Sequence, residues 1–373
     1  MRSHRLASAA ALAFTIVLAL AACEGTPSNR ADTAEVADAA DALPDAQPDL
    51  PDAAVETDAA EPELPPSPPD YPLDDTLRVN HIQALGTHNS YHIQPEDPVP
   101  SWEYTHAPLD VQLDELGVRQ VELDIHYEAP GEFSVYHLPL FDDRSTCADL
   151  GSCLTLVRDW SDAHPGHHLL WVLIEPKDEL DAEKLGTHFA EVDAALKAVW
   201  PPERVLTPDD VRGDRASIRE ALTLDGWPTL GAVRDKVMFV MLDEGEHRAA
   251  YLETFPDLVG AMIFMRGGRG EPWGAVLELS DARTQGEAIA SALAENYLVR
   301  SSAGGPDDTP EDVSARAAAA LAAGATFIST DFPGGGVDEP RRFTIPGGQP
   351  SRCNPVTAPA ACTAADIEAL GGP

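Results

Sequence analysis

Short apolar runs alternate with longer helical patterns along most of this chain, from about Asp75 to about Ile345. Apolar runs of this length indicate buried strands, and strands separated by helical periods indicate βα units that build a parallel sheet. The span holds enough chain for one barrel of about 250 residues. Because the strands are unevenly spaced, the sequence predicts an α/β fold with a distorted (β/α) TIM-type barrel. A doubly wound open sheet is the alternative.

The barrel domain is predicted to cover residues 75–345. We expect its strands at Ile82–Thr87, Arg119–Ile125, Phe133–His137, Leu169–Glu175, Val237–Leu242, Met262–Met265, Ala275–Leu279, Tyr297–Arg300 and Thr326–Thr330. We expect its helices at Leu109–Leu116, Cys153–His164, Ala182–Val199, Ile218–Asp225, Thr229–Arg234, His247–Glu253, Gly286–Glu295 and Pro310–Ala323. Residues 346–373 are rich in Gly and Pro near their start and are interpreted as a C-terminal extension.

The N-terminal segment has the features of a bacterial lipoprotein signal. Two arginines near the start precede a short apolar stretch that ends in Leu20-Ala21-Ala22-Cys23, which resembles a lipoprotein cleavage box. We therefore predict a signal peptide at 1–22 and lipidation of Cys23, with an ordinary secretory signal as the alternative. The stretch is too short to favour a permanent transmembrane helix. A lipidated chain would be anchored to a membrane by acyl chains without spanning it.

The segment that follows is predicted to be a disordered tether at 23–74. It is rich in Ala, Pro and Asp, and Arg30 is the only basic residue between Glu24 and Asp70. Such a segment cannot bury enough apolar surface to offset the entropy of ordering it. Proline and the repulsion between like charges should keep it extended.

The formal net charge of −38 comes partly from this tether and partly from the rest of the chain. A nucleic-acid partner is not expected for such an acidic protein. Anionic lipid headgroups also repel an acidic surface. Attack on an anionic lipid would therefore need local positive charge, a metal ion or tethering.

Five cysteines are present, and Cys23 is assigned to the lipid. Cys147 and Cys153 flank one short loop, and Cys353 and Cys362 flank another near the C-terminus. In an exported protein, two close pairs indicate two local disulfides. Zinc binding is the alternative, although neither pair has the tight spacing of two intervening residues.

Three carboxylates and one amide lie at the ends of predicted strands. Glu122 and Asp124 alternate with apolar residues, so both side chains project from one strand face. Glu175 ends a strongly apolar strand, and Asn89 follows the first strand. The C-terminal ends of barrel strands share one rim, so we expect these four side chains to lie close together.

Burying like charges costs on the order of several kcal/mol unless the charges are paired or bound to a metal. An all-oxygen set suits calcium, which takes about six to eight oxygens at roughly 2.3–2.6 Å. The sequence therefore predicts one Ca²⁺ ion at this rim. Ion pairing of Glu122 and Asp124 with arginines such as Arg119 is the alternative.

Two histidines remain for proton transfer, His88 after the first predicted strand and His137 at the end of the third. One can assist an attacking hydroxyl and the other can protonate a leaving oxygen, each contributing on the order of 10²–10⁴ in rate. Taken alone, His88 could instead be a capping histidine or a buried core histidine. His137 could merely flank the loop between Cys147 and Cys153. Lys177, Arg300 and Asp331 are candidate substrate-binding residues, and each could instead form a structural ion pair.

Four motifs together resemble the phosphatidylinositol-specific phospholipase C superfamily, and more narrowly its calcium-dependent bacterial branch. They are Gly86-Thr87-His88-Asn89-Ser90-Tyr91, Glu122-Leu123-Asp124, Tyr136-His137 and Ile174-Glu175-Pro176-Lys177. The resemblance covers roughly Val79 to Pro333. The late stretch from Ala325 to Pro333 also resembles the end of such barrels.

The resemblance implies that His88 and His137 are the catalytic pair and that the carboxylates and Asn89 hold calcium. Calcium-independent relatives use a basic side chain in place of the metal, whereas this chain keeps the complete carboxylate set. The implied reaction is attack by the inositol 2-hydroxyl on the adjacent phosphodiester, which releases diacylglycerol and an inositol cyclic phosphate. The implied partners are an inositol phospholipid and, through the N-terminal anchor, a bacterial membrane of the cell envelope or surface. We expect a monomer.

Three other functions are compatible with parts of the pattern. A glycerophosphodiester phosphodiesterase can use the same barrel, but that family usually opens with a histidine–arginine–glycine turn, whereas Asn89 and Ser90 follow His88 here. A zinc-dependent hydrolase is the second alternative. The third is a catalytically inactive lipoprotein that binds inositol lipids or glycans.

Overall fold

Eight parallel strands form a nearly closed barrel in the computed structural model, which describes residues 69–179, 185–334, 339–347 and 350–368. Their order is β6-β5-β4-β2-β1-β9-β8-β7, and one bridge between Arg266 and Val276 joins the two end strands. The barrel strands are β1 (Ile82–Thr87), β2 (Val118–Ala129), β4 (Leu170–Pro176), β5 (Val237–Met241), β6 (Ile263–Met265), β7 (Val276–Glu278), β8 (Leu298–Ser302) and β9 (Phe327–Thr330). The predicted distorted (β/α) barrel is confirmed.

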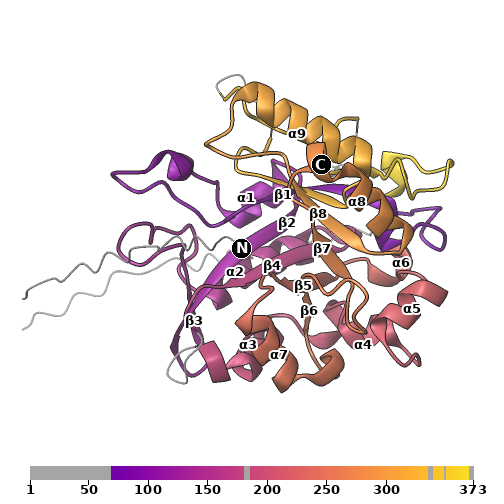
Figure 1. Cartoon of the computed structure of the whole chain (residues 1–373), viewed down its shortest axis with the longest axis horizontal. Coiled ribbons are helices and arrows are strands. Elements are labelled where there is room, and N and C mark those ends of the chain that lie inside the picture. Colours follow the sequence, from indigo (N-terminus) through magenta and orange to yellow (C-terminus); the bar gives the residue numbers. More distant parts are fainter. Residues whose placement is uncertain (1–68, 180–184, 335–338, 348–349, 369–373) are drawn as a thin grey trace, which may run out of the picture. The chain divides into compact units, whose positions relative to one another are not determined.

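Helices surround these strands on the outside (Figure 1). The described α-helices are α1 (Leu109–Asp114), α2 (Leu150–Ala163), α3 (Phe189–Val199), α4 (Pro208–Arg212), α5 (Ile218–Leu224), α6 (Leu230–Val233), α7 (Glu246–Thr254), α8 (Ala282–Ala294) and α9 (Pro310–Ala323). Short 3₁₀ turns lie at Val79–His81, Pro100–Trp102, Leu185–Thr187, Pro202–Arg204, Pro256–Leu258 and Ala364–Asp366. One distortion is the connection 266–275, which joins β6 to β7 without a helix.

The barrel interior and the helices explain the residue types in each element. In β4, Leu170 to Ile174 are all buried, and Trp171 packs against Phe327 of β9 with ring centroids 5.4 Å apart. Such a strand is apolar on both faces because it lies between the barrel interior and the outer helices. α9 is defined instead by its ends, since Thr309 accepts a hydrogen bond from the backbone of Asp312 and Gly324 adopts a left-handed φ of 86°.

Most predicted elements form within a few residues of the predicted bounds, and those of β1 and α9 are identical. The strand predicted at Phe133–His137 is wrong as a barrel strand, because β3 (Glu132–Val135) pairs antiparallel with β2 as a hairpin. His137 lies beyond the end of β3. α4 was not predicted from the sequence, and the predicted helix start at Ala182 lies outside the described residues.

Both predicted disulfides form, Cys147–Cys153 and Cys353–Cys362. The first closes the loop that leads into α2, where Asp149 accepts a hydrogen bond from the backbone of Ser152 at the helix start. The second lies in the C-terminal segment. These four cysteines are therefore not zinc ligands.

The segment after residue 346 is part of the barrel domain and not a mere extension. Residues Ser351–Cys353 form β10, which pairs antiparallel with β1. Glu368 is buried and forms an ion pair with the guanidinium of Arg119 in β2. Burial opposes ionisation of Glu368, but the Arg119 charge lowers its pKa to about 2. Arg119 is thus the partner of the C-terminal segment and not of Glu122 or Asp124.

Described residues before the predicted boundary at 75 also pack against the barrel domain. Tyr71 is buried, and the guanidinium of Arg234 lies 3.6 Å from the centre of its ring. Asp74 forms an ion pair with Arg234 at 2.6 Å. The predicted signal peptide, Cys23 and the tether up to residue 68 lie outside the described residues. In the part of the chain that the structure describes, no helix combines the length and apolar character needed to cross a bilayer.

Substitution of Glu368 should show how strongly the C-terminal segment holds the barrel. Glu368→Gln leaves the Arg119 charge buried without its ionic partner, which typically costs about 3–5 kcal/mol. We expect a loss of this size in the free energy of unfolding, measured by urea denaturation. Arg215→Gln, which removes an exposed ion pair with Asp225, is the control and should leave the urea midpoint nearly unchanged. Equal effects of the two substitutions would contradict a structural role for the tail.

Candidate active site

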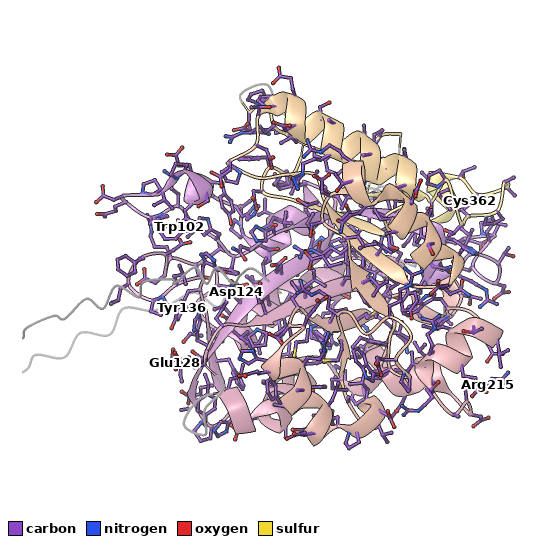
Figure 2. The ribbon with its side chains drawn as sticks, in the orientation of Figure 1. Trp102, Asp124, Glu128, Tyr136, Arg215 and Cys362 are labelled. Atoms are coloured by element: carbon purple, nitrogen blue, oxygen red, sulfur yellow. A yellow bond between two sulfur atoms is a disulfide. The ribbon has the colours of Figure 1, made fainter. Side chains whose placement is uncertain are left out.

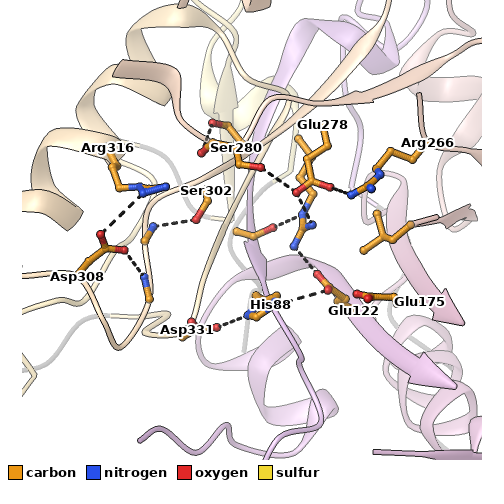
Figure 3. A pocket seen from close by; sticks show the side chains of 16 residues that line it. His88, Glu122, Glu175, Arg266, Glu278, Ser280, Ser302, Asp308, Arg316 and Asp331 are labelled. Carbon is orange, nitrogen blue, oxygen red and sulfur yellow. Dashed lines mark hydrogen bonds and ion pairs between the residues drawn. The ribbon is translucent and has the colours of Figure 1, made fainter. Parts of the chain in front are cut away.

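A polar cavity of about 360 Å³ lies at the C-terminal ends of the barrel strands (Figure 3). All eight barrel strands or the segments directly after them contribute its walls, together with Arg316 of α9. This is the rim where the sequence placed its candidate residues. The charged and histidine side chains that line it are His88, Glu122, Glu175, Arg266, Glu278, Arg300, Asp308, Arg316 and Asp331.

Strand geometry brings three carboxylates together at this rim. Glu122 and Asp124 alternate along β2, and both are almost fully buried. Glu175 of β4 stands directly opposite Asp124 in the parallel pairing of the two strands. Oxygen atoms of the three carboxylates all lie within 4.8 Å of one another.

Burial disfavours the charged form of the carboxylates in this cluster. Burial, reinforced by Glu175 and Glu122 and opposed by Lys177, raises the pKa of Asp124 to about 8. Burial also raises the pKa of Glu122, although the Arg300 charge acts in the opposite direction. A positive charge close to these groups is therefore needed to keep them ionised at neutral pH.

Asn89, the fourth candidate ligand, has an unusual backbone conformation. Its φ of 43° is in the left-handed region, which non-glycine residues rarely adopt outside special sites. The backbone of Ser90 donates a hydrogen bond to the Glu122 carbonyl at 3.0 Å, which ties this turn to β2. The Oδ1 atoms of Asn89 and Asp124 are buried, and neither accepts a hydrogen bond within the described part of the chain.

These features fit a calcium ion. The four candidate ligands offer only oxygen atoms, and 4.8 Å is about twice a calcium–oxygen bond of roughly 2.3–2.6 Å. Buried acceptors without a donor are rare and need a reason, and a bound cation supplies one. The structure thus brings Glu122, Asp124 and Glu175 into one cluster and ties the turn that carries Asn89 to β2.

His88 lies at the edge of the same cavity and remains 45% exposed. Its Nδ1–H donates a hydrogen bond to Asp331 at 2.9 Å, and its Nε2 lies 4.0 Å from Glu122. Burial opposes protonation, but the Asp331 and Glu122 carboxylates raise the pKa of His88 to about 9. Asp331 therefore fixes the ring, and Nε2 is directed toward the carboxylate cluster.

His137 has an equivalent arrangement on the loop after β3. Its Nδ1–H donates a hydrogen bond to Asp142 at 2.8 Å, and Asp142 also accepts one from Nε2 of His92 at 2.8 Å. Burial opposes ionisation, but these two hydrogen bonds lower the pKa of Asp142 to about 2. His137 is outside the set of residues that line the cavity, and it is connected to the first motif through Asp142 and His92.

Asp142 and His92 were not predicted as site residues. The only sequence signal for Asp142 is a carboxylate five residues after His137, in a loop that a cysteine pair follows. His92 lies three residues after Asn89, but nothing in its neighbours indicates a partner fifty residues away.

The three candidate substrate-binding residues all form ion pairs. Lys177 contacts Asp124 at 3.0 Å and Glu175 at 2.7 Å. Arg300 contacts Glu122 and also Glu278, the latter at 3.2 Å. As described above, Asp331 pairs with His88.

Arg266, Arg316 and Glu278 also line the cavity, although the sequence did not single them out. Figure 3 shows Glu278 between Arg266 and the guanidinium that contacts Glu122. Arg316 lies 3.8 Å from Asp308 and 3.9 Å from Asp281. No local pattern marks these residues, because each is isolated at the end of a strand or on a helix.

Two solved structures that resemble this chain are enzymes of the same kind. A Ca²⁺-dependent phosphatidylinositol-specific phospholipase C from Streptomyces antibioticus is 22% identical over 68% of this chain and 95% of its own, with a TM-score of 0.54. A calcium-dependent phosphoinositol-specific phospholipase C from a Gram-negative Pseudomonas species is 18% identical over 76% of this chain and 97% of its own, with a TM-score of 0.56. At these identities the likeness shows a shared fold. No curated protein matches the chain.

The family model described as "Phosphoinositide phospholipase C, Ca2+-dependent" matches residues 77–135 and 127–355. The matched region contains the barrel, the carboxylate cluster and both histidines with their carboxylate partners. The chain therefore belongs to the Ca²⁺-dependent phosphoinositide phospholipase C family.

Proposed function

We propose that this phospholipase C-type enzyme cleaves phosphatidylinositol to diacylglycerol and an inositol cyclic phosphate, with one Ca²⁺ ion held by Asn89, Glu122, Asp124 and Glu175. The observation that carries the proposal is the carboxylate cluster, in which three acidic side chains lie within 4.8 Å at the barrel rim. Bound calcium would lower the pKa of an attacking hydroxyl and of the neighbouring imidazole, and would neutralise charge on the phosphoryl oxygens.

The two histidines supply proton transfer in this proposal. His88 accepts the proton of the inositol 2-hydroxyl at Nε2 as that oxygen attacks phosphorus. His137 donates a proton from Nε2 to the glycerol oxygen as the phosphorus–oxygen bond breaks. Each ring is held at Nδ1 by its own carboxylate, Asp331 or Asp142, which fixes its orientation and leaves Nε2 for the substrate.

An exposed apolar loop supports a lipid substrate. In the 138–141 loop, directly after His137, Leu140 is 88% exposed and Phe141 is 71% exposed. Trp102 packs edge-on against His137 with ring centroids 6.0 Å apart, and Figure 2 labels it on the same side of the barrel as Asp124 and Tyr136. Exposed large apolar side chains next to an active site are suited to insertion into a bilayer.

We also propose that lipidated Cys23 tethers the protein to a membrane of the cell envelope as an exported, monomeric lipoprotein. The tether offsets the repulsion that a chain with a formal net charge of −38 experiences near anionic lipid. Insertion of the 138–141 loop then brings the cavity to the headgroups.

Product analysis by phosphorus NMR tests the reaction and the calcium site together. With phosphatidylinositol and calcium we expect an inositol cyclic phosphate, and a calcium chelator should abolish its formation. Asp124→Asn removes one ligand charge, so it should raise the calcium concentration for half-maximal activity by about tenfold or more. Asp143→Asn, at an exposed position in the loop after β3, is the control. Its calcium concentration for half-maximal activity should match that of the wild type.

Two outcomes would contradict this proposal. Unchanged calcium dependence in Asp124→Asn would exclude the metal assignment. Cleavage of glycerophosphoinositol but not of phosphatidylinositol would favour the glycerophosphodiester phosphodiesterase alternative.

The general-acid role of His137 predicts a dependence on the leaving group. His137→Ala should slow release of an alkyl alkoxide by about 10²–10⁴. The same variant should slow release of nitrophenolate from a soluble inositol phosphodiester much less, because that group leaves without protonation. Steady-state rates on both substrates provide the measurement, with His164→Ala as the control. Equal losses on the two substrates would exclude the role.

If the 138–141 loop inserts into the bilayer, substitutions in it should weaken binding to vesicles without lowering activity on a soluble substrate. Fully burying a Leu or Phe side chain is worth about 1.5–3 kcal/mol. The double variant Leu140→Ser/Phe141→Ser should therefore weaken binding to phosphatidylcholine vesicles that contain phosphatidylinositol by at least about tenfold. Its activity on a soluble substrate should stay near that of the wild type.

The matched control is Leu224→Ser/Val259→Ser, because both residues are also exposed and lie on α5 and after the turn at Pro256–Leu258. Sedimentation with vesicles measures the affinity of each variant. Equal loss of binding in the two double variants would show that the 138–141 loop has no special role.

A further inference from the structure

Lys177 places its ammonium group between two of the proposed calcium ligands. Nζ lies 3.0 Å from Oδ2 of Asp124 and 2.7 Å from Oε1 of Glu175. The two carboxylates face each other across β2 and β4, so one ammonium can contact both. An ammonium and a calcium ion at these oxygens would repel each other strongly, because both are cations in a largely buried site.

The main chain around Lys177 is held by hydrogen bonds to β2, whereas its ammonium is held by ion pairs with Asp124 and Glu175. The backbone N–H of Lys177 donates to the Ile125 carbonyl at 3.1 Å. The next residue, Asp178, accepts a hydrogen bond from the backbone of Tyr127 at 2.6 Å and pairs with His126 at 3.1 Å. Lysine has a flexible four-carbon stem, so its ammonium can leave the two carboxylates without any backbone change.

Arg300 is another cation at the cluster, and it is held more firmly. Its guanidinium contacts Glu122, Glu278 at 3.2 Å and the hydroxyl of Ser329 at 3.0 Å. These partners come from three different strands, so release of Arg300 would break several hydrogen bonds at once. Lys177, with two carboxylate partners on neighbouring strands, is the cation that can be exchanged.

We propose that Lys177 is a built-in competitor of calcium, whose ammonium must leave Asp124 and Glu175 when the ion binds. The inference rests on the proposed calcium site. The ammonium neutralises the carboxylates when calcium is scarce and thereby sets the calcium concentration at which the enzyme becomes active. Binding of the ion exchanges one positive charge for two and frees the lysine amine.

Calcium affinity measured by isothermal titration calorimetry provides the first test. Lys177→Met removes the charge and keeps a side chain of similar length, so calcium should bind tighter by on the order of tenfold. Lys177→Arg retains a cation and should not show this gain. Lys197→Met, on the exposed surface of α3, is the control and should match the wild type. Unchanged or weaker binding in Lys177→Met would overturn the proposal.

Chemical reactivity of the Lys177 amine provides the second test. It shows whether calcium displaces the ammonium from its carboxylates or is only repelled by an ammonium that stays in place. The chain has four lysines, at 177, 184, 197 and 236, so peptide mass spectrometry can follow each one after limited acetylation. Calcium should increase acetylation of Lys177 severalfold relative to Lys197, because only a released amine becomes accessible. No change in this ratio at saturating calcium would overturn displacement.

The two tests also distinguish this inference from the proposed function. If the wild type binds calcium and Asp124→Asn does not, but Lys177→Met behaves as the wild type, the calcium site is retained and the competition is wrong. If the wild type binds no calcium at all, both proposals are wrong.

Discussion

The crowding of carboxylates at one rim of the barrel is the constraint on which the rest of the site depends. It follows directly from strand geometry, because alternate residues of β2 project from one face and the parallel register sets Glu175 opposite Asp124. Their burial raises the pKa of Asp124 to about 8. A protein tolerates such a cluster only where positive charge compensates it.

The structure supplies that charge in two different ways. Arg300 is fixed by partners on three strands, whereas Lys177 has a flexible stem and, among the described residues, pairs with Asp124 and Glu175. If Lys177 is exchangeable as proposed, the site keeps the Arg300 charge when the ammonium leaves and frees carboxylate oxygens for a metal ion. The buried Oδ1 atoms of Asn89 and Asp124, which accept no hydrogen bond within the described residues, agree with this division.

The sequence predicted the barrel and the carboxylates because both depend on local periodicity. Apolar runs define β1 and β4, and alternation within β2 alone places Glu122 and Asp124 on one face. The same reasoning failed for Phe133–His137, since a short segment in which Ser134 separates apolar residues has the same pattern in a barrel strand and in a hairpin. A barrel strand and a hairpin strand differ in the strand with which they pair, and the residues of one strand alone do not show which strand that is.

The partners of the charged groups could not be predicted for the same reason. Arg119 lies three residues before Glu122, yet it pairs with Glu368, which is 249 residues away. Asp142 joins His137 to His92 across fifty residues. Such contacts are fixed by the closure of the barrel and by the C-terminal strand β10, whose pairing with β1 has no signal in its three residues.

The acidity of the chain gives the apolar loop its importance. A formal net charge of −38 gives no long-range attraction to an anionic bilayer, and the arginines at the cavity are already paired with carboxylates. Approach to a lipid substrate must therefore depend on contacts that act only at short range. In the proposed function, the 138–141 loop provides them at the position where His137 needs the leaving oxygen. A single loop would then couple insertion into the bilayer to the orientation of the general acid, because Leu138 and Asp142 exchange backbone hydrogen bonds at its base.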